Sequence, residues 1–312
     1  MPQKTILFDL THNEMLNIED AEFSEFLNLL KRMDFRIKKT ENEHLKKDLL
    51  SDVDLLIIGN PIDDYFSSIE VKYIIDFVRN GGGILLLSEY GADHLQKTNL
   101  NDISGKFGIL FEKNIIKEIN RTNQKSSSIL SIKNFSKHNI TRHIREIVIG
   151  GACSLILSKN AKPIFRITKD NAWTEIFNNT KEQWIKEEQG KEQIIAAYVE
   201  FGQGKVLAIG DIDIFTNDFN IGINSLDNQR FLQNVINWLI EPVKEQKVVR
   251  FLLNQLGDLQ YEIRETNKVL NNIIETITIL EKRISYLEEH SEFYKLKLEN
   301  KEKSEIKSIQ KD

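Results

Sequence analysis

The stretch from Leu55 to Ile109 reads LLIIGNPIDDYFSSIEVKYIIDFVRNGGGILLLSEYGADHLQKTNLNDISGKFGI. Two apolar runs, Val53–Ile58 and Ile84–Leu87, have the length and composition of strands that are buried on both faces. Between them, apolar residues at three- and four-residue spacing predict a helix, with Val71, Ile74, Ile75 and Val78 on one face. Ser67 or Ser68 can cap this helix, and the triplet GGG can end it. A strand, a helix and a strand in this order indicate a parallel sheet.

The same alternation continues toward the N-terminus. Thr5–Leu10 and Phe35–Lys38 are further predicted strands, and His44–Leu50 is a predicted short helix. A further helix is predicted between the strands Thr5–Leu10 and Phe35–Lys38. One of its faces is apolar and consists of Phe23, Phe26, Leu27, Leu30 and Met33.

Toward the C-terminus, Ile194–Phe201 and Lys205–Gly210 predict an antiparallel pair of strands joined by a tight glycine-containing turn. A helix that Asp227 can cap follows, and it must stop before Pro242. We therefore expect an α/β fold, a mostly parallel sheet with helices on both faces, over residues 1–242.

Composition excludes several classes of protein. The chain has 312 residues and a formal net charge of −5, so it lacks the basic character of a general nucleic-acid-binding protein. Its single cysteine, Cys153, excludes an intramolecular disulfide framework and a cysteine-rich zinc site. No apolar run approaches the ~20 residues that a membrane helix needs, and no signal peptide is visible. We expect a cytoplasmic protein with no membrane span and no cofactor.

Beyond Pro242 the pattern changes to a heptad repeat. From Val249 to Leu287 the spacing of the apolar residues alternates between three and four, and Thr266 is the polar exception. The seam is formed by Leu252, Leu256, Leu259, Ile263, Leu270, Ile273, Ile277, Leu280, Ile284 and Leu287. The sequence thus predicts a long coiled-coil helix over residues 243–298 and a charged flexible tail over 299–312.

A lone helix cannot bury this stripe, so it either folds back on the α/β domain or pairs with another helix, from a second copy of the chain or from another protein; the narrow, long stripe favours pairing. Arg283 and Glu288 occupy g and following e positions, a pairing that favours parallel dimers. Val269 and Ile274 are apolar at g and e, which widens the stripe and leaves a trimer or a mixed bundle open. We therefore expect a homo-oligomer or a hetero-coiled coil.

A set of short motifs in a fixed order resembles a known family. Within the quoted stretch these are Pro61, Phe66, Glu70, Gly81–Gly83, Glu89, Gly91, Thr98-Asn99, Asn101 and Phe107-Gly108-Ile109. Asp9, His12, Asn13 and Glu14 fit the opening strand and loop, and later pieces are Asn139-Ile140-Thr141, Gly210–Asn217 and Asp227-Asn228. The pattern resembles the domain at the N-terminus of intraflagellar transport protein 52, which is shared with bacterial gliding-motility and ABC-transport auxiliary proteins.

The resemblance implies a class I glutamine amidotransferase-like fold, flavodoxin-like in topology, without amidotransferase activity. The residues agree, because an active enzyme needs a glycine-flanked cysteine on the turn after the predicted strand Ile84–Leu87. This turn reads Leu87-Ser88-Glu89-Tyr90-Gly91, and no His-x-Glu lies near the end of the domain. Ser88 as a nucleophile is the weaker alternative, and we expect no catalytic residue.

Several polar side chains follow predicted strands, where α/β sheets bind ligands. They are Asp9, His12, Glu89, Asp211 and Asp213. We expect them to line one edge of the sheet as an acidic rim that can bind a small ligand or a divalent cation. We favour a structural role for these carboxylates over ligand binding, because Asp-x-Asp with Thr216-Asn217 also forms a self-bonded turn. The histidines show no metal-binding spacing, and Cys153 is expected to be a buried structural residue.

The leading hypothesis is a non-enzymatic scaffold or adaptor, in which the α/β domain presents a recognition surface and the coiled coil sets the oligomeric state or recruits a helix. The alternative is a small-ligand or cation sensor, or an enzyme, that uses the acidic rim. A third interpretation, an auxiliary subunit of a membrane transporter, follows from the bacterial relatives.

Overall fold

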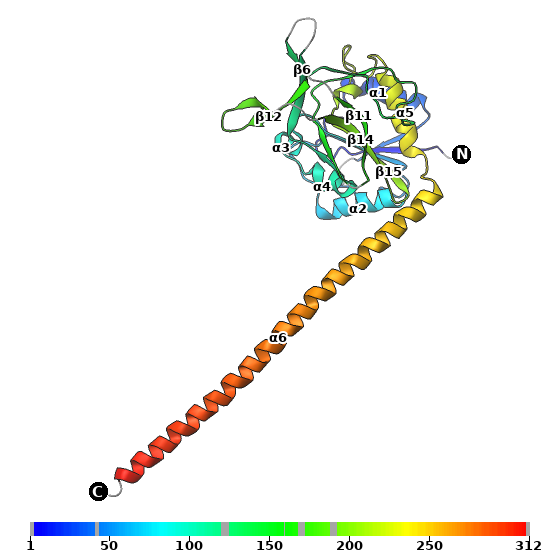
Figure 1. The fold of residues 1–312 in the computed structure, drawn as a ribbon. Coiled ribbons are helices and arrows are strands. Elements are labelled where there is room, and N and C mark those ends of the chain that lie inside the picture. The colour runs from blue at the N-terminus through cyan, green and yellow to red at the C-terminus, as the bar shows by residue number, and fades with distance from the viewer. Residues whose placement is uncertain are drawn as a thin grey trace. The chain divides into compact units, whose positions relative to one another are not determined.

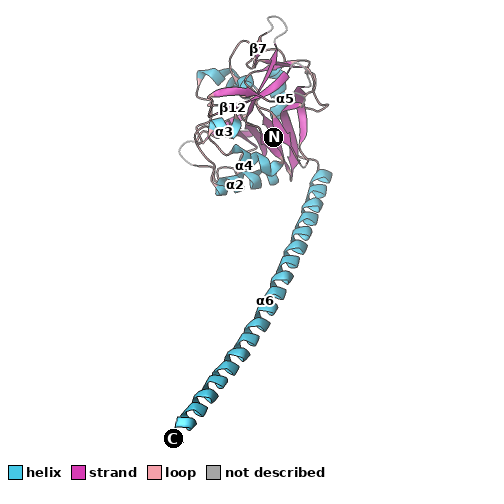
Figure 2. Ribbon diagram, turned by 60° about the vertical axis from the view of Figure 1, so that its left-hand side comes forward, coloured by secondary structure: helices cyan, strands magenta, loops and turns pink. Residues whose placement is uncertain are grey.

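The computed structural model describes residues 3–40, 44–119, 125–158, 160–167, 172–187 and 192–309, without the side chains of 245–247, 250, 254, 299 and 301–309. The chain divides into two compact units, Met1–Val249 and Arg250–Asp312. The first is an α/β unit, and the second consists of one helix (Figures 1 and 2).

A seven-stranded sheet forms the centre of the α/β unit, in the order β11-β14-β15-β4-β3-β1-β2. The strands are β1 (Thr5–Phe8), β2 (Arg36–Lys39), β3 (Leu55–Gly59), β4 (Gly83–Leu87), β11 (Lys162–Ile167), β14 (Gln193–Phe201) and β15 (Gly204–Ile209). β2, β1, β3, β4 and β15 are mutually parallel, and β14 and β11 extend the sheet in antiparallel fashion. Because the parallel part runs second, first, third, fourth and fifth along the chain, its topology is flavodoxin-like, as expected.

Helices cover both faces of this sheet, because its strands are apolar on both sides. Successive residues of β4 alternate between two cores: Leu85 and Leu87 belong to one, Ile84 and Leu86 to the other. The first core includes buried residues of α1 (Ser24–Arg32) and α5 (Asn228–Ile240). The second includes those of α2 (Ser68–Arg79) and α4 (Leu100–Ser104). The result is a three-layered α/β/α unit.

Local chemistry sets where these helices begin. Ser67 caps α2 through a capping box, in which its hydroxyl oxygen accepts from the Glu70 amide while the Glu70 carboxylate accepts from the Ser67 amide. α5 begins differently from what the sequence predicts. Asp227 stands at the N-cap position, but its carboxylate accepts from the amides of Arg145 and Glu146 instead of from the helix. Asp227 therefore ties a distant loop to the start of α5.

Smaller sheets and short helices complete the unit. The short helices are η1 (Ala21–Phe23), α3 (Ala92–Gln96), η2 (Gly105–Phe107) and η3 (Asp213–Phe215). The additional strands are β5 (Ile109–Phe111), β6 (Asn114–Ile119), β7 (Ser126–Ser127), β8 (Leu130–Ile132), β9 (Ile147–Ile149), β10 (Leu155–Leu157), β12 (Ala172–Asn178) and β13 (Gln183–Lys186). The sequence analysis missed the β12–β13 hairpin. The helix predicted at His44–Leu50 is wrong, because residues 44–46 have no regular secondary structure and residues 47–50 form turns.

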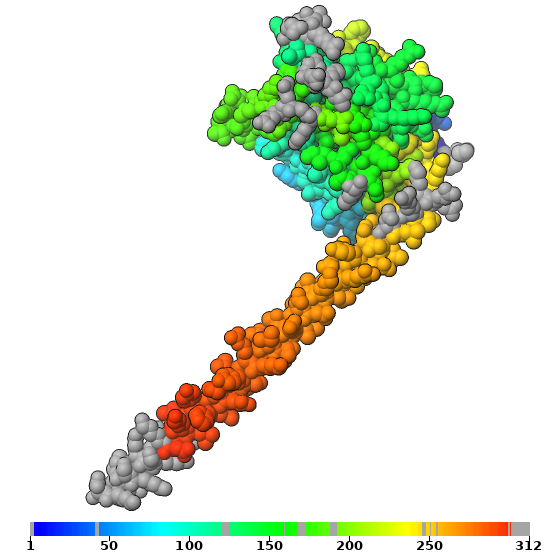
Figure 3. Space-filling model, viewed as in Figure 1, coloured from blue at the N-terminus to red at the C-terminus, as the bar shows by residue number. Residues whose placement is uncertain are grey.

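The last element is α6 (Glu245–Ile309), a helix of 65 residues that begins at the end of the first unit and makes up the second from Arg250 onward. The seam side chains from Leu252 to Leu287 are between 49% and 65% exposed. Figure 3 shows this helix in a space-filling view. Thr266, the polar seam position, donates its hydroxyl to the Glu262 carbonyl at 2.9 Å, so its polar group is satisfied within the helix. Among the described residues, no helix is both long and apolar enough to cross a membrane. The last residues of the predicted tail, 310–312, lie outside the described chain.

Candidate functional site

The residues of the predicted acidic rim follow three parallel strands, β1, β4 and β15. The structure brings them together in two groups instead of one. Asp9 and His12, with Glu14, form one group, and Glu89, Asp211 and Asp213 form the other. β3 separates β1 from β4 in the sheet, which is why the two groups remain distinct. We call them the histidine cluster and the carboxyl cluster; the histidine cluster also contains His44 and Glu70.

A buried Asp–His pair forms the centre of the histidine cluster. His12 Nδ1 lies 2.7 Å from Asp9 Oδ2, and both side chains have no exposed surface. The hydroxyls of Thr11 and Thr40 donate to Asp9 Oδ1 at 2.8 and 3.0 Å. Burial opposes the charge of Asp9, but the hydrogen bond and the charge of His12 outweigh it and lower the pKa of Asp9. Burial likewise opposes the charge of His12, whereas Asp9 and then Glu70 raise its pKa above 6.5.

Glu14 contributes a neutral group to the same cluster. Burial, followed by the charge of Asp9, raises the pKa of Glu14 to about 10. One Glu14 oxygen accepts from the His12 amide at 3.2 Å, and the other has no hydrogen-bond partner among the described residues. At neutral pH, Glu14 is therefore protonated and adds no negative charge beside Asp9.

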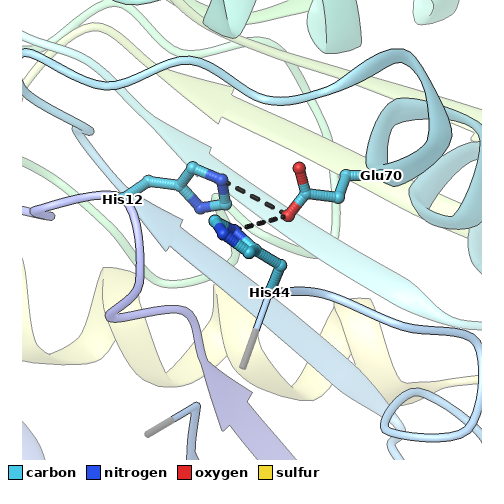
Figure 4. A group of neighbouring side chains, drawn as sticks. All are labelled: His12, His44 and Glu70. Atoms are coloured by element: carbon cyan, nitrogen blue, oxygen red, sulfur yellow. Dashed lines mark ion pairs between the residues drawn. The ribbon is translucent and has the colours of Figure 1, made fainter. Parts of the chain in front are cut away.

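Sequence analysis missed two members of this cluster, His44 and Glu70. Glu70 Oε1 lies 3.4 Å from His12 Nε2 and 3.4 Å from His44 Nδ1 (Figure 4). The capping motif that starts at Ser67 could have drawn attention to Glu70. No local pattern reveals His44, because its approach to His12 depends on the tertiary fold.

The carboxyl cluster brings three acidic oxygens within 4.8 Å of one another. Asp211 accepts from the amides of Asp213 and Ile214 at 3.2 and 3.3 Å, so the expected self-bonded turn is present. Burial, followed by the charges of Asp211 and Asp213, raises the pKa of Glu89 well above its ordinary value. Burial followed by Asp213 does the same for Asp211. One Glu89 oxygen, Oε1, has no hydrogen-bond partner among the described residues.

The turn after β4 differs from a nucleophile elbow in its surroundings. Ser88 is 2% exposed and lies beside the buried thiol of Cys153, which is not a base. Cys153 is fully buried, as expected, and burial raises the pKa of its thiol well above the usual value. A reactive nucleophile needs access to substrate, and the burial of Ser88 does not provide it.

The chain has the strand order of β1 to β4 described above and carries Glu89, not a cysteine, in the turn after β4. Known proteins share this region. Residues 5–127 match the family described as IFT52 GIFT domain. The resemblance inferred from the sequence motifs is thereby confirmed over this range. Asp9, His12, Glu70 and Glu89 lie inside the matched GIFT region, whereas Asp211 and the whole of α6 lie outside it.

Solved structures extend the comparison of the fold. The structure described as "mmIFT52 N-terminal domain" superposes with a TM-score of 0.61 at 18% identity, covering 76% of this chain and 97% of that one. A cytoplasmic protein from Salmonella typhimurium superposes with a TM-score of 0.50 at 11% identity, covering 77% of this chain and all of that one. These likenesses show the fold. No curated protein sequence matches the chain.

Proposed function

We propose that this protein is a non-enzymatic scaffold or adaptor, with a role in protein assembly like that of intraflagellar transport proteins. In this proposal the α/β unit presents a recognition surface and α6 forms a coiled coil with a second copy of the chain or with a partner helix. The observation that carries the proposal is the apolar seam of α6, which is about half exposed or more along its whole length. A cytoplasmic location and the absence of nucleic-acid partners belong to the same proposal, given one cysteine and a net charge of −5.

The energetics favour association. Full burial of a Leu or Ile side chain is worth ~1.5–3 kcal/mol, whereas bringing two chains together costs ~4–15 kcal/mol. Even half of this burial, summed over the seam of two helices, exceeds the cost. The paired charges Arg283 and Glu288 add a preference for a parallel arrangement.

The experiment measures oligomeric state by light scattering on the full chain at tens of micromolar. We expect the wild type to be oligomeric and the double variant Ile277→Asp with Leu280→Asp to be monomeric, because both positions lie on the seam. The matched control, Thr278→Asp with Ile279→Asp, carries the same added charge at outer b and c positions and should remain oligomeric. A monomeric wild type, unaffected by either change, would remove the main support for the scaffold.

The absence of enzymatic activity is a further part of the proposal. The burial of Ser88 argues against nucleophilic catalysis at the turn after β4. The assay is glutamine hydrolysis with the purified full chain. Hydrolysis above background that disappears in Ser88→Ala would contradict this part, whatever the oligomeric state.

A second candidate function rests on the carboxyl cluster and continues the acidic-rim hypothesis. Three neighbouring carboxyl groups, one with the unpartnered oxygen Glu89 Oε1, either share protons or neutralise one another through a bound cation or a polar ligand. Under this alternative the chain is a ligand or cation sensor. Its test is a thermal upshift on addition of calcium or magnesium that is absent in Asp213→Asn. Equal melting with and without the ion in both proteins would exclude the cation form of this alternative.

A further inference from the structure

Three metal-ligating side chains from distant segments converge in the histidine cluster. His12 lies in the loop after β1, His44 lies after β2, and Glu70 lies in the first turn of α2. One oxygen of Glu70, Oε1, is 3.4 Å from both His12 Nε2 and His44 Nδ1, and Figure 4 shows the two rings directed at this oxygen. The three ligand atoms all lie within 4.8 Å of one another.

His12 is held in the tautomer that a metal ligand requires. Its Nδ1 lies 2.7 Å from the buried Asp9 carboxylate and donates to it, which leaves the Nε2 lone pair facing Glu70. The His12 side chain is completely buried, yet Nε2 has no hydrogen-bond partner among the described residues. At metal sites a histidine commonly donates one ring N–H to a carboxylate, which orients the other ring nitrogen toward the metal, and His12 has this arrangement.

Glu70 is equally well oriented. Its second oxygen, Oε2, accepts from the amide and the hydroxyl of Ser67, at 2.9 and 2.7 Å. Oε1 accepts from the Leu45 amide at 3.2 Å, which fixes the plane of the carboxylate. Because Leu45 follows His44 in the chain, the same hydrogen bond keeps His44 close to Glu70. The Phe66 ring lies 3.9 Å from the His12 ring and closes one side of the cluster. The fold therefore holds the ligand atoms of His12 and Glu70 in place.

We propose that His12 Nε2, His44 Nδ1 and Glu70 Oε1 bind one divalent ion of the zinc type. Two ligand atoms bound to tetrahedral zinc at the usual ~2.0–2.1 Å lie about 3.4 Å apart, which matches both separations to Glu70 Oε1. Two imidazoles and one carboxylate are a donor set that zinc takes in proteins, with water in the fourth position. The His44 side chain is 70% exposed, so this fourth position faces solvent and the ion has a path of entry.

Charge balance favours the same occupant. Asp9 and Glu70 bring two carboxylates to one buried site. A divalent cation neutralises both carboxylates at once. The ion would join the loops after β1 and β2 to the start of α2, so it would stabilise this edge of the unit without any role in the coiled coil.

The test uses the full chain, freed of metal by a chelator and titrated with zinc by calorimetry and with cobalt by visible absorption. We expect one zinc per chain and the intense absorption of four-coordinate cobalt. His44→Ala removes an exposed ligand that the fold does not need, and it should weaken zinc binding at least ~100-fold, because even an outer-shell partner is worth 10–100-fold. Glu70→Gln should weaken it as well while keeping a hydrogen-bonding side chain at the cap.

The matched control is His94→Ala, which removes an exposed histidine that lies outside the three metal-binding groups found among the described residues. It should bind zinc as the wild type does, and zinc should raise the thermal midpoint of both proteins but not that of His44→Ala. Absence of stoichiometric zinc binding by the folded wild type, or equal affinity in His44→Ala, would overturn the site and leave a protonated His12 between two carboxylates. Oligomeric state is measured separately, so failure here leaves the scaffold proposal unaffected.

Discussion

The α/β unit and α6 contain the same kinds of apolar side chain in opposite surroundings. In β3 and β4 every residue is buried, whereas Leu256, Ile277 and Leu280 of α6 are 54%, 49% and 49% exposed. A buried leucine in the sheet is already stabilised by its own unit, but a seam leucine gains this stabilisation only from another helix. The difference teaches that the α/β unit buries its own apolar surface, whereas the seam of α6 stays exposed in the single chain, which is why we propose that it assembles with another helix.

The largest expected effect is in the α/β core. Phe231, which is fully buried in α5, packs against Phe165 with ring centroids 5.6 Å apart. Phe231→Ala should lower the free energy of unfolding by about 3–5 kcal/mol, because it removes a large side chain and leaves a cavity. Urea denaturation followed by tryptophan fluorescence measures this unit alone, since Trp173, Trp184 and Trp238 all lie within it.

The control for this substitution is Phe219→Ala. Phe219 is 91% exposed, so its loss should change the free energy of unfolding by no more than ~0.5 kcal/mol. Equal costs at positions 219 and 231 would break the comparison, because they would show that burial does not decide stability in this unit.

The next effect sharpens the comparison on the helix side. Leu280→Ala should leave the fluorescence-detected unfolding unchanged but weaken self-association at least ~30-fold, since a buried Leu→Ala change costs 2 kcal/mol or more. Sedimentation at several concentrations measures the association constant. Ile279→Ala, at the neighbouring outer position with 53% exposure, should associate as the wild type does. If both variants weaken association equally, the seam is not the contact surface.

The same contrast explains what could be predicted from the sequence. Continuous apolar runs such as Leu55–Gly59 identified the buried parallel strands, and the heptad spacing identified α6, because both signals are local and periodic. The β12–β13 hairpin was missed because Ala172–Asn178 mixes polar and apolar residues without strict alternation. His44–Leu50 was predicted as a helix from its composition, but in the structure its end forms turns and Leu45 packs in the second core.

The candidate sites were only half predictable. The residues that follow strands, such as Asp9 and Glu89, could be placed at one edge of the sheet, because strand direction fixes where each strand ends. Which of them meet depends on strand order, and β3 lies between β1 and β4. His44 and Glu70 join His12 through tertiary contacts between three segments, and no spacing in the sequence encodes them. Local patterns thus predict which edge carries a site, whereas its membership depends on the fold.

Burial in the α/β unit also destabilises the charged form of an acidic side chain, Asp93, a penalty that the exposed side chains of α6 avoid. Burial first, and then the charge of Asp102, raise the pKa of Asp93 to about 6, and its Oδ1 has no hydrogen-bond partner among the described residues. Because this folded-state pKa exceeds the ordinary 3.8, the folded state holds the proton more tightly, and stability falls as pH rises from about 4 to above 6. Asp93→Asn should therefore raise the thermal midpoint at pH 7.5 by about 2–4 °C, or ~1 kcal/mol after allowance for its partial exposure.

At pH 4 the same variant should show only a small part of this gain, because Asp93 is then protonated in the folded chain and partly protonated in the unfolded chain. The exposed Asp48 provides the control, and Asp48→Asn should shift the midpoint equally at both pH values. A gain for Asp93→Asn that is the same at pH 4 and pH 7.5 would show that its charge is not the cause.

The smallest effect concerns glycine in the two regions. A Cβ at Gly204 would lie 2.1 Å from the Val78 carbonyl oxygen, so the sheet needs glycine there. Gly257, at an outer b position of α6, has nothing within 4 Å of such a Cβ. Gly257→Ala should therefore stabilise the helix by about 0.5–1 kcal/mol, because alanine loses less backbone entropy than glycine. Circular dichroism at 222 nm should show a higher melting temperature for the helix and no change in tryptophan fluorescence. If association weakens instead, then position 257 packs closely against another chain, and the contact surface of α6 extends beyond the a and d seam.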